Sequence, residues 1–281
     1  MISFGQLNVT MRSHLPYSVA LSNIGGYVDS SGNEYALVGT YNGLSIVDVT
    51  DPANPVIKFN IAGTNSDWRE VKTWQNYAYV TTEGCCNGLQ ILNLGYLPDS
   101  VPTKYYKGNG AINNQLNTIH ALHVDAGYAY LYGSNLFNGA ALILDLANPW
   151  TPNYVGHTAG TYIHDGYVRN DTLYGCHIYD GYFSVIDVTN KANPITITTQ
   201  NTPNLFTHNS WLNDAGNVLF TTDEVSDSYL TSYDISDLNN ITELNRIQLT
   251  PGSGSIVHNT HTLNDYEVVS WYKDGIAIVD A

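Results

Sequence analysis

Four histidines are the residues of this chain whose spacing most strongly suggests chemistry. They open four short segments: His120-Ala-Leu-His, His164-Asp-Gly-Tyr, His208-Asn-Ser-Trp and His258-Asn-Thr-His. Neutral imidazole binds zinc, copper, iron and nickel. Because equivalent strands of a repeating fold can bring remote side chains together, we expect His120, His164, His208 and His258 to bind a divalent metal ion. The alternative is a polar channel lining that holds only water.

Other polar residues could complete this site. In an alignment of the segments, Asn23 and Arg69 occupy the histidine position in the two remaining repeats. Residues that follow the histidines, such as Asp165, could orient the imidazoles or bind a harder cation such as Ca²⁺ through oxygen. We expect Glu83 to pair with Arg69. The residues expected at the same mouth are Asn23, Arg69, Glu83, His177, Asn209 and Asn259.

Three carboxylates are candidates for a general base if a metal activates water there. Asp165 follows a ring histidine, and Asp223 and Glu224 end the second strand of their repeat. A solvated acidic loop is the alternative for Asp223 and Glu224. The sequence contains no nucleophile elbow, phosphate-binding loop, dinucleotide fingerprint or HExxH zinc motif.

The remaining histidines do not fit the ring position. His123 and His261 lie three residues after ring histidines, and an odd offset along a strand points to the opposite face. We therefore expect neither to be a metal ligand. His14 and His157 lie outside the pattern and are expected at the surface or in packing.

A repeated phrase indicates which elements position these residues. A glycine or tyrosine is followed by alternating apolar residues and then by Asp or Asn, in six copies roughly 45 residues apart, which is the period of a four-stranded propeller blade. The copies close at Asp48, Asn93, Asp145, Asp187, Asp234 and Asp280. Aromatic and β-branched runs precede each copy, as strands require.

The sequence therefore predicts an all-β fold: a six-bladed β-propeller of four-stranded antiparallel blades, forming one domain over residues 1–281. An X-Pro step after four copies marks the outermost strand, where proline is tolerated. The sixth copy has no outer strand after it. We expect an N-terminal strand at about residues 7–11 to complete the sixth blade and close the ring.

Charge and hydropathy exclude several functions. The chain carries 25 acidic and 10 basic residues, a formal charge of −15, which disfavours nucleic acid as a partner. No apolar run is long enough to span a membrane. Charged residues make up only 12%, which favours an extracellular or cell-surface location, although no signal peptide is visible.

The three cysteines do not form a disulfide framework. Cys85 and Cys86 are adjacent, and Cys176 is isolated. Three free thiols and a vicinal disulfide at Cys85–Cys86 are both compatible with the sequence.

The repeat also carries a family resemblance. Ile46 to Val56, which contains Ile-Val-Asp-Val and Asp-Pro-Ala-Asn-Pro-Val, resembles the LVIVD-repeat proteins. With Trp68–Lys72, Ile163–Asp165 and Phe206–His208, the chain resembles the choice-of-anchor B family of secreted or surface bacterial proteins. The resemblance implies a surface-exposed propeller, often joined to a C-terminal anchoring segment that is not visible in this sequence. It implies no defined activity.

Two functions are compatible with these observations. The first is an extracellular scaffold module that binds a surface protein or a glycan and has a metal-binding, histidine-lined channel. The second is a metal-dependent hydrolase or lyase acting on an ester, lactone or phosphoester at the channel mouth. A metal-bound water would be the reactive group in the second case.

Overall fold

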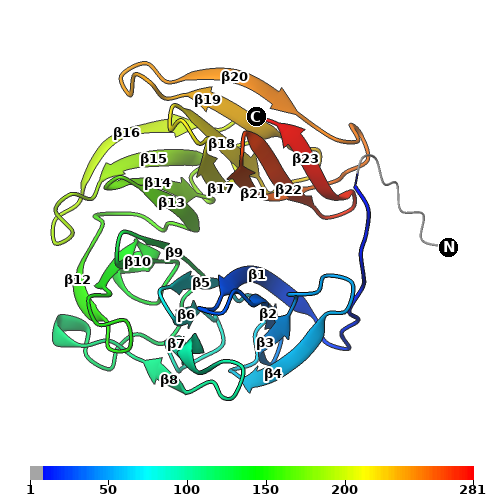
Figure 1. Cartoon of the computed structure of the whole chain (residues 1–281). Helices are drawn as coiled ribbons and strands as arrows, with labels where there is room; N and C mark the ends of the chain where they lie inside the picture. The colour runs from blue at the N-terminus through cyan, green and yellow to red at the C-terminus, as the bar shows by residue number, and fades with distance from the viewer. Residues whose placement is uncertain (1–8) are drawn as a thin grey trace.

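The computed structural model describes residues 9–281, and the strands of this part form six antiparallel sheets arranged as propeller blades (Figure 1). The predicted all-β, six-bladed architecture is confirmed. In every blade the strands follow one another from the innermost to the outermost in chain order.

The first three blades contain twelve strands. These are β1 (Leu21–Val28), β2 (Glu34–Thr40), β3 (Gly43–Asp48), β4 (Val56–Ala62), β5 (Val71–Trp74), β6 (Tyr77–Val80), β7 (Leu89–Asn93), β8 (Thr103–Tyr106), β9 (Ala121–Asp125), β10 (Tyr128–Tyr132), β11 (Leu142–Asp145) and β12 (Asn153–His157). Three short 3₁₀ helices lie in the connections: η1 (Leu94–Tyr96), η2 (Gly110–Ile112) and η3 (Phe137–Gly139).

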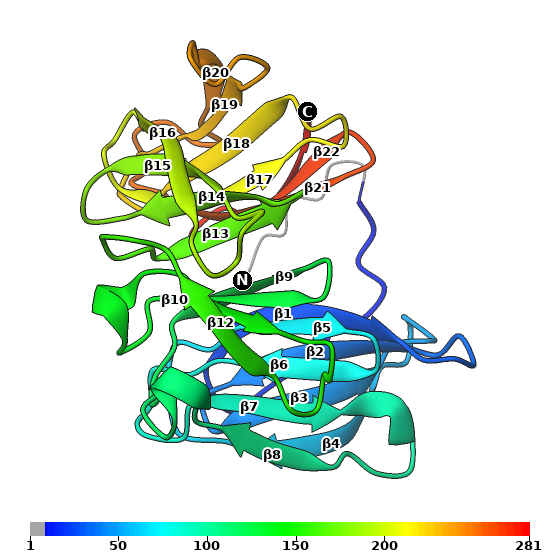
Figure 2. The same ribbon diagram turned by 90° about the vertical axis from the view of Figure 1, so that its left-hand side faces the viewer.

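The last three blades contain eleven strands. These are β13 (Asp165–Arg169), β14 (Thr172–His177), β15 (Tyr182–Asp187), β16 (Ile195–Asn201), β17 (Thr207–Leu212), β18 (Val218–Asp223), β19 (Leu230–Asp234), β20 (Thr242–Ile247), β21 (Val257–Leu263), β22 (Tyr266–Trp271) and β23 (Gly275–Asp280). Figure 2 shows blades 1–3 and blades 4–6 as the two halves of the molecule.

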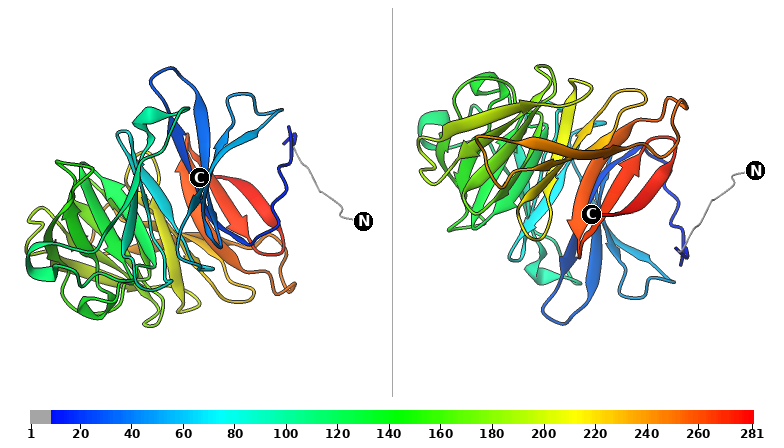
Figure 3. Two further views of the ribbon diagram at one scale, coloured as in Figure 1. Left: turned by 90° about the horizontal axis from the view of Figure 1, so that it is seen from below. Right: turned by 90° about the horizontal axis from the view of Figure 1, so that it is seen from above.

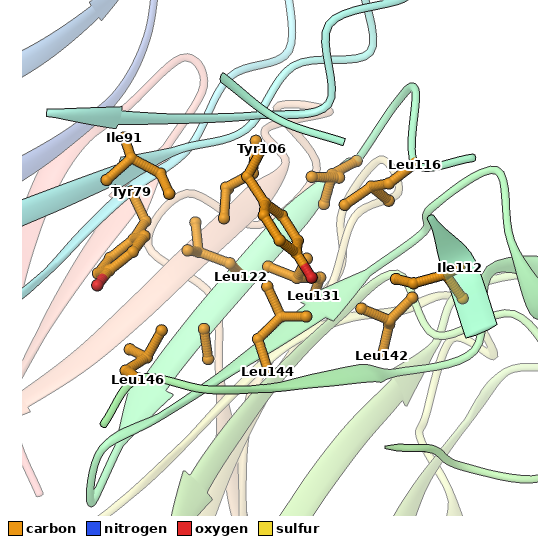
Figure 4. Packing of buried hydrophobic residues seen from close by; sticks show 13 residues of the cluster. Tyr79, Ile91, Tyr106, Ile112, Leu116, Leu122, Leu131, Leu142, Leu144 and Leu146 are labelled. Atoms are coloured by element: carbon orange, nitrogen blue, oxygen red, sulfur yellow. The ribbon is translucent and has the colours of Figure 1, made fainter. Parts of the chain in front are cut away.

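The core lies between neighbouring blades, not inside one sheet. Tyr79 and Ile91 of blade 2 pack against Leu122, Leu131 and other apolar side chains of blade 3 (Figure 4). Four further clusters join the other successive pairs of blades. Burying this surface stabilises the stack by roughly 25 cal/mol per Å² of apolar area, which explains why the middle strands are apolar on both faces.

The innermost strands are what place the candidate site. β1, β5, β9, β13, β17 and β21 contact one another in that order around the axis. The outermost strands β4, β8, β12 and β16 each begin directly after a proline: Pro55, Pro102, Pro152 and Pro194. This confirms the edge position that the X-Pro steps predicted.

The predicted closing strand lies partly outside the described residues. The sixth sheet has three strands, β21–β22–β23. Of the predicted strand, residues 7 and 8 lie outside the described residues, and residues 9–11 are not in a strand. The segment that follows is held by blade 1 instead, because Ser13 Oγ donates to Pro52 O and Tyr17 Oη donates to Ser45 Oγ. Figure 1 shows blades 1 and 6, in blue and red, as the two ends of the arc, and Figure 3 shows them from below and from above.

Of the two alternatives for the cysteines, the structure contains the vicinal disulfide. Cys85 and Cys86 form a vicinal disulfide in an exposed loop after β6, and Cys176 is a buried free thiol in β14. In residues 9–281 no helix has the length and apolar character needed to cross a bilayer.

Candidate metal centre

Four innermost strands bring the four predicted histidines together at one end of the channel. His120 and His164 immediately precede β9 and β13, whereas His208 and His258 lie within β17 and β21. The ring centroids of His120 and His164 are 4.1 Å apart, those of His164 and His208 are 4.7 Å apart, and those of His208 and His258 are 4.2 Å apart. The four imidazoles, remote in sequence, therefore form one continuous row.

The Nε2 atoms of this row lie close to one another or to the Glu224 carboxylate. His120 Nε2 lies 3.1 Å from His164 Nε2. Glu224 Oε2 lies 3.6 Å from His208 Nε2, and Glu224 Oε1 lies 3.6 Å from His258 Nε2. Donor atoms of His164, His208 and Glu224 all lie within 4.8 Å of one another.

These separations fit donors that share one ion. A separation of 3.6 Å is too long for a hydrogen bond. Zinc binds imidazole nitrogen and carboxylate oxygen at roughly 2.0–2.2 Å, so two tetrahedral donors stand about 3.3 Å apart. The imidazole and carboxylate donors of this row are a set that a transition-metal ion accepts.

The outward nitrogens of the histidines have partners that orient the rings. Glu83 Oε1 lies 2.6 Å from His120 Nδ1. His208 Nδ1 donates to the His258 carbonyl oxygen over 3.2 Å. Since both acceptors require a proton on Nδ1, the Nε2 of each neutral ring keeps its lone pair for a metal. Tyr162 Oη lies 3.5 Å from His164 Nδ1 and is a third partner of this kind.

Burial keeps His164 and His208 uncharged. Desolvation lowers the pKa of His164 to about 2, and the neighbouring His120 and His258 add to this shift. Desolvation also lowers the pKa of His208 well below its usual value, with the other ring histidines adding to it. Neutral imidazole is the form that binds a metal, so His164 and His208 are in the binding-competent state at neutral pH.

The position of Glu224 suits a role different from the one that the sequence suggested. The sequence suggested a catalytic base, whereas the structure places this carboxylate between His208 and His258 as a potential ligand. Tyr272 Oη donates to Glu224 Oε1 over 2.7 Å and holds the carboxylate in this position. Neither Tyr272 nor Tyr162 was assigned a role from the sequence: Tyr272 contacts Glu224 from the neighbouring blade, and Tyr162 lies two residues before the repeated histidine position.

Glu83 and Arg69 do not form the predicted ion pair. Glu83 contacts His120 instead. The Arg69 guanidinium is buried between blades 1 and 2, where its Nε donates to Thr40 O over 3.1 Å and its Nη2 donates to Thr64 O over 2.5 Å. A buried guanidinium needs acceptors for its N–H groups, and backbone carbonyls supply them here. Arg69 is therefore part of the packing between the blades.

Asn23 is one residue away from the histidine position. In blade 6 a bulge separates the pairs Val257–Trp271 and Thr260–Val269, and His258 lies within it. In blade 1 the equivalent bulge separates Leu21 from Ile24. The first residue after Leu21, Ser22, is thus equivalent to His258, and the sequence alignment placed Asn23 one residue too far along the strand.

The residues after the histidines tie neighbouring blades together. Asp165 Oδ2 accepts from Asn209 Nδ2 over 2.7 Å, and Asp165 Oδ1 accepts from its neighbour Gly166 N over 2.7 Å. Asn209 Oδ1 in turn accepts from Thr260 N of blade 6 over 3.0 Å. Burial raises the pKa of Asp165 to about 7, and the Glu70 carboxylate adds to this shift. These contacts do not point Asp165 or Asn209 at the imidazole row.

Two more predicted mouth residues lie outside the row. Asn259 follows His258, and its Oδ1 is buried without a hydrogen-bond partner among the described residues. His177 is buried in blade 4, where its Nε2 lies 2.8 Å from Ser184 Oγ and its Nδ1 lies 3.0 Å from Thr161 Oγ1. Burial lowers the pKa of His177 to about 4. Both ring nitrogens are thus already paired with hydroxyl groups.

Asp223 organises a loop. Its carboxylate accepts from Thr202 Oγ1 over 2.5 Å, from Asn204 N over 2.9 Å and from Phe206 N over 3.2 Å. These three bonds connect the end of β16 to the start of β17 and leave Asp223 in a structural position. Of the three candidate bases, only Glu224 reaches the histidines.

His123 and His261 form a separate layer farther along the channel. The His123 ring packs at 4.9 Å from Tyr167 and 5.6 Å from Trp211, and the His261 ring packs at 4.3 Å from Trp211. Neither belongs to the imidazole row, as the strand offset predicted. Outside both groups, His157 stacks on Phe137 at 3.6 Å, and His14 is exposed.

The repeat itself connects this chain to known proteins. Residues 27–62 and 174–202 match the LVIVD repeat. These matches cover the three outer strands of blade 1 and of blade 4. The chain is a β-propeller with LVIVD repeats. No curated protein matches the sequence of this LVIVD propeller significantly.

Solved structures confirm the fold of the LVIVD propeller. A putative 6-phosphogluconolactonase from Bacteroides uniformis is 12% identical, with 91% of this chain and 79% of that chain covered and a TM-score of 0.64. The computationally designed Ika8 protein is 10% identical, with coverages of 93% and 71% and a TM-score of 0.60. The propeller domain of Cps50 (Swd1) from Myceliophteria thermophila is 11% identical, with coverages of 94% and 82% and a TM-score of 0.64. At such identities the similarity shows the architecture alone.

Proposed function

We propose that this LVIVD propeller is an extracellular scaffold module whose imidazole row binds one transition-metal ion. The observation that carries the proposal is the row of four imidazoles in which donor atoms of His164, His208 and Glu224 lie within 4.8 Å of one another. His258 Nε2 lies 3.6 Å from Glu224 Oε1, and His120 Nε2 lies 3.1 Å from His164 Nε2. Four of the six blades supply the imidazoles, so an ion would also crosslink these four blades.

The donor types favour a transition metal over Ca²⁺. Calcium prefers six to eight oxygen ligands. Here the oxygen-bearing candidates Asp165 and Asn209 form hydrogen bonds to neighbouring blades. Asp223 forms hydrogen bonds to the connection between β16 and β17. Imidazole nitrogen supplies most of the remaining donors, which suits zinc, copper, nickel or iron.

An extracellular location is supported by two features. The vicinal disulfide Cys85–Cys86 lies in an exposed loop, and disulfides persist in oxidising compartments. The LVIVD repeats and the resemblance to choice-of-anchor B proteins favour a protein displayed at a cell surface. Exposed Trp68, Tyr179 and Tyr272 follow or precede strands at the same end as the imidazoles and could contact a surface protein or a glycan.

Metal stoichiometry tests the proposal. The purified chain is stripped with a chelator, titrated with Zn²⁺ by calorimetry, and analysed for bound metal after gel filtration. We expect one ion per chain, and the loss of binding in His164→Ala and in His208→Ala. The exposed His14→Ala variant is the matched control and should bind as the unaltered chain does. Failure of the unaltered chain to retain metal, or equal binding by all variants, would leave a polar channel lining.

A metal-dependent hydrolase is the second candidate function, because Glu224 reaches the row from a loop at the mouth. A bound ion would supply Lewis acidity toward a substrate carbonyl. Glu83 and Glu224 make this mouth acidic, and Arg69 is bound to carbonyl oxygens, so a neutral ester or lactone fits better than a phosphoester. Turnover of an ester and lactone panel by the metal-loaded chain, lost in His164→Ala, would support this function over the scaffold.

A further inference from the structure

Within residues 9–281, the last strand of blade 6 has an edge without a partner strand. In blades 1–5 the third strand always pairs with an outer strand, as in β3–β4, β7–β8, β11–β12, β15–β16 and β19–β20. β23 occupies the third position of blade 6 and pairs only with β22 among the described strands. A strand that is internal in every other blade thus presents unpaired backbone N–H and C=O groups.

The side chains of this edge leave it unprotected. Natural edge strands discourage pairing with other chains through lysine, proline or other charged residues. Three of the outer strands of this propeller carry such residues: Lys58 in β4, Lys104 in β8 and Arg246 in β20. β23 has the sequence Gly-Ile-Ala-Ile-Val-Asp, and its first and second isoleucines, Ile276 and Ile278, are 78% and 55% exposed.

Exposed apolar side chains are concentrated at this end of the arc. In the described part of the chain, the inner three strands of blades 2–5 contain no exposed large apolar side chain. Those of blades 1 and 6 contain seven: Leu21, Ile24, Val28, Leu263, Tyr266, Ile276 and Ile278. Elsewhere in the molecule, a neighbouring blade covers apolar faces of this kind. Apolar side chains are therefore required to cover them at this end of the arc as well.

We propose that β23 is an acceptor site for an extended strand of a second polypeptide, which pairs with β23 as the fourth strand of blade 6. This proposal is independent of the metal. The partner that the site fits is a segment of alternating apolar and polar residues. A neutral or basic segment fits best, because the propeller carries a formal charge of −15.

The other blades give the expected register. Asp48 pairs with Val56 and Val47 with Ile57, and a bulge then brings Ile46 opposite Phe59. The same shift occurs in the outer pairs of blades 3, 4 and 5. The incoming strand should therefore run antiparallel to β23, start opposite Asp280, and place one extra residue opposite the Ile278–Val279 step.

A peptide from the chain itself is a suitable probe. Residues 54–62 (Asn-Pro-Val-Ile-Lys-Phe-Asn-Ile-Ala) form the outer strand of blade 1. The peptide, labelled with a fluorophore, is titrated with the full chain and followed by anisotropy. Hydrogen exchange of residues 275–280 is measured with and without the peptide. We expect saturable binding and slower exchange in β23, because its backbone groups become paired.

Two matched substitutions locate the site. Ile276→Lys places a charge on the β23 edge and should weaken peptide binding at least about tenfold. Ile195→Lys alters an isoleucine of outer strand β16 that is also well exposed, and should leave binding unchanged. Because both side chains are exposed, both variants should keep the melting temperature of the unaltered chain.

Three results would overturn the proposal. The first is no peptide binding, and the second is equal binding by Ile276→Lys. The third is binding that appears only after residues 1–8 are deleted, which would show that the chain fills the edge with its own N-terminus. A peptide with Phe59→Pro, which cannot complete the ladder, should not bind; equal binding by this peptide also contradicts strand pairing.

Discussion

The hydrogen-bond partner of each outward nitrogen decides which histidine nitrogen remains for a metal. Glu83 and the His258 carbonyl hold the Nδ1 protons of His120 and His208, and this orients the opposite nitrogens inward. Tyr272 does the same for a carboxylate by donating to Glu224. At the scale of single residues, the site therefore depends on contacts behind the ligands as well as on the ligands.

Removing the Tyr272 hydroxyl should weaken metal binding without unfolding the protein. Tyr272→Phe loses the bond to Glu224 Oε1, and the loss of such an orienting partner typically lowers metal affinity about 10–100-fold. The ring is 61% exposed, so the melting temperature of the metal-free chain should not change. Zn²⁺ calorimetry checks the affinity. Tyr179→Phe, at a more exposed tyrosine without a hydroxyl contact to the row, should bind zinc normally; similar weakening in both variants would contradict the account.

At the scale of elements, polar side chains connect the innermost strands of neighbouring blades. Asn209 donates to Asp165 of blade 4 and accepts from Thr260 N of blade 6. Glu70 of blade 2 accepts from Leu122 N of blade 3 in the same way. Among the described strands, those of different blades are not paired in one sheet, so these side chains supply hydrogen bonds between the blades near the axis. The role explains why Asp165 and Asn209 are unavailable to a metal.

Cutting this connection should destabilise the fold. Asn209→Ala leaves the Asp165 carboxylate and the Thr260 N–H buried without their partner, and each such group costs about 1–3 kcal/mol. We expect the free energy of unfolding in urea to fall by about 2–4 kcal/mol. Asn240→Ala, at an exposed asparagine in a loop, should change it by less than about 0.5 kcal/mol. Equal effects of the two substitutions would show that the connection contributes nothing.

Sequence periodicity predicted the elements better than the contacts between them. The phrase ending at Asp48 and its five copies specified the blades, because alternation of apolar residues and blade length follow directly from residue order. The same register brought His120, His164, His208 and His258 together. Asn23 was placed one residue away from the equivalent position because the first repeat has no histidine there to fix its alignment. The Glu83–Arg69 pair failed because both side chains had better partners on other blades.

At the scale of the whole molecule, the channel buries several groups that must stay neutral. Desolvation lowers the pKa of His123 to about 3 and of His261 to about 4, and the Lys72 ammonium adds to both shifts. Unfolded histidine titrates near ~6.5. Because the folded pKa values lie below this, both groups stabilise the fold fully above about pH 6.5, and that stability is lost as the pH falls toward about 4.

Acid should therefore weaken the metal-free propeller. We expect the melting temperature, measured in chelator, to fall between pH 7 and pH 5. His123→Phe removes one titrating group while keeping an aromatic ring against Tyr167 and Trp211, so its melting temperature should fall less. His14→Gln, at an exposed histidine, should follow the unaltered chain. Identical pH dependence in all three proteins would contradict this origin of the acid sensitivity.

The central claim is that the imidazole row is a metal site, and X-ray absorption of the zinc-loaded protein tests it most directly. The account predicts a first shell of nitrogen and oxygen atoms at roughly 2.0–2.2 Å, with the outer-shell scattering that several imidazoles produce. The imidazole signal should decrease in His164→Ala. A shell of oxygen atoms alone, or an unchanged spectrum in that variant, would contradict the account.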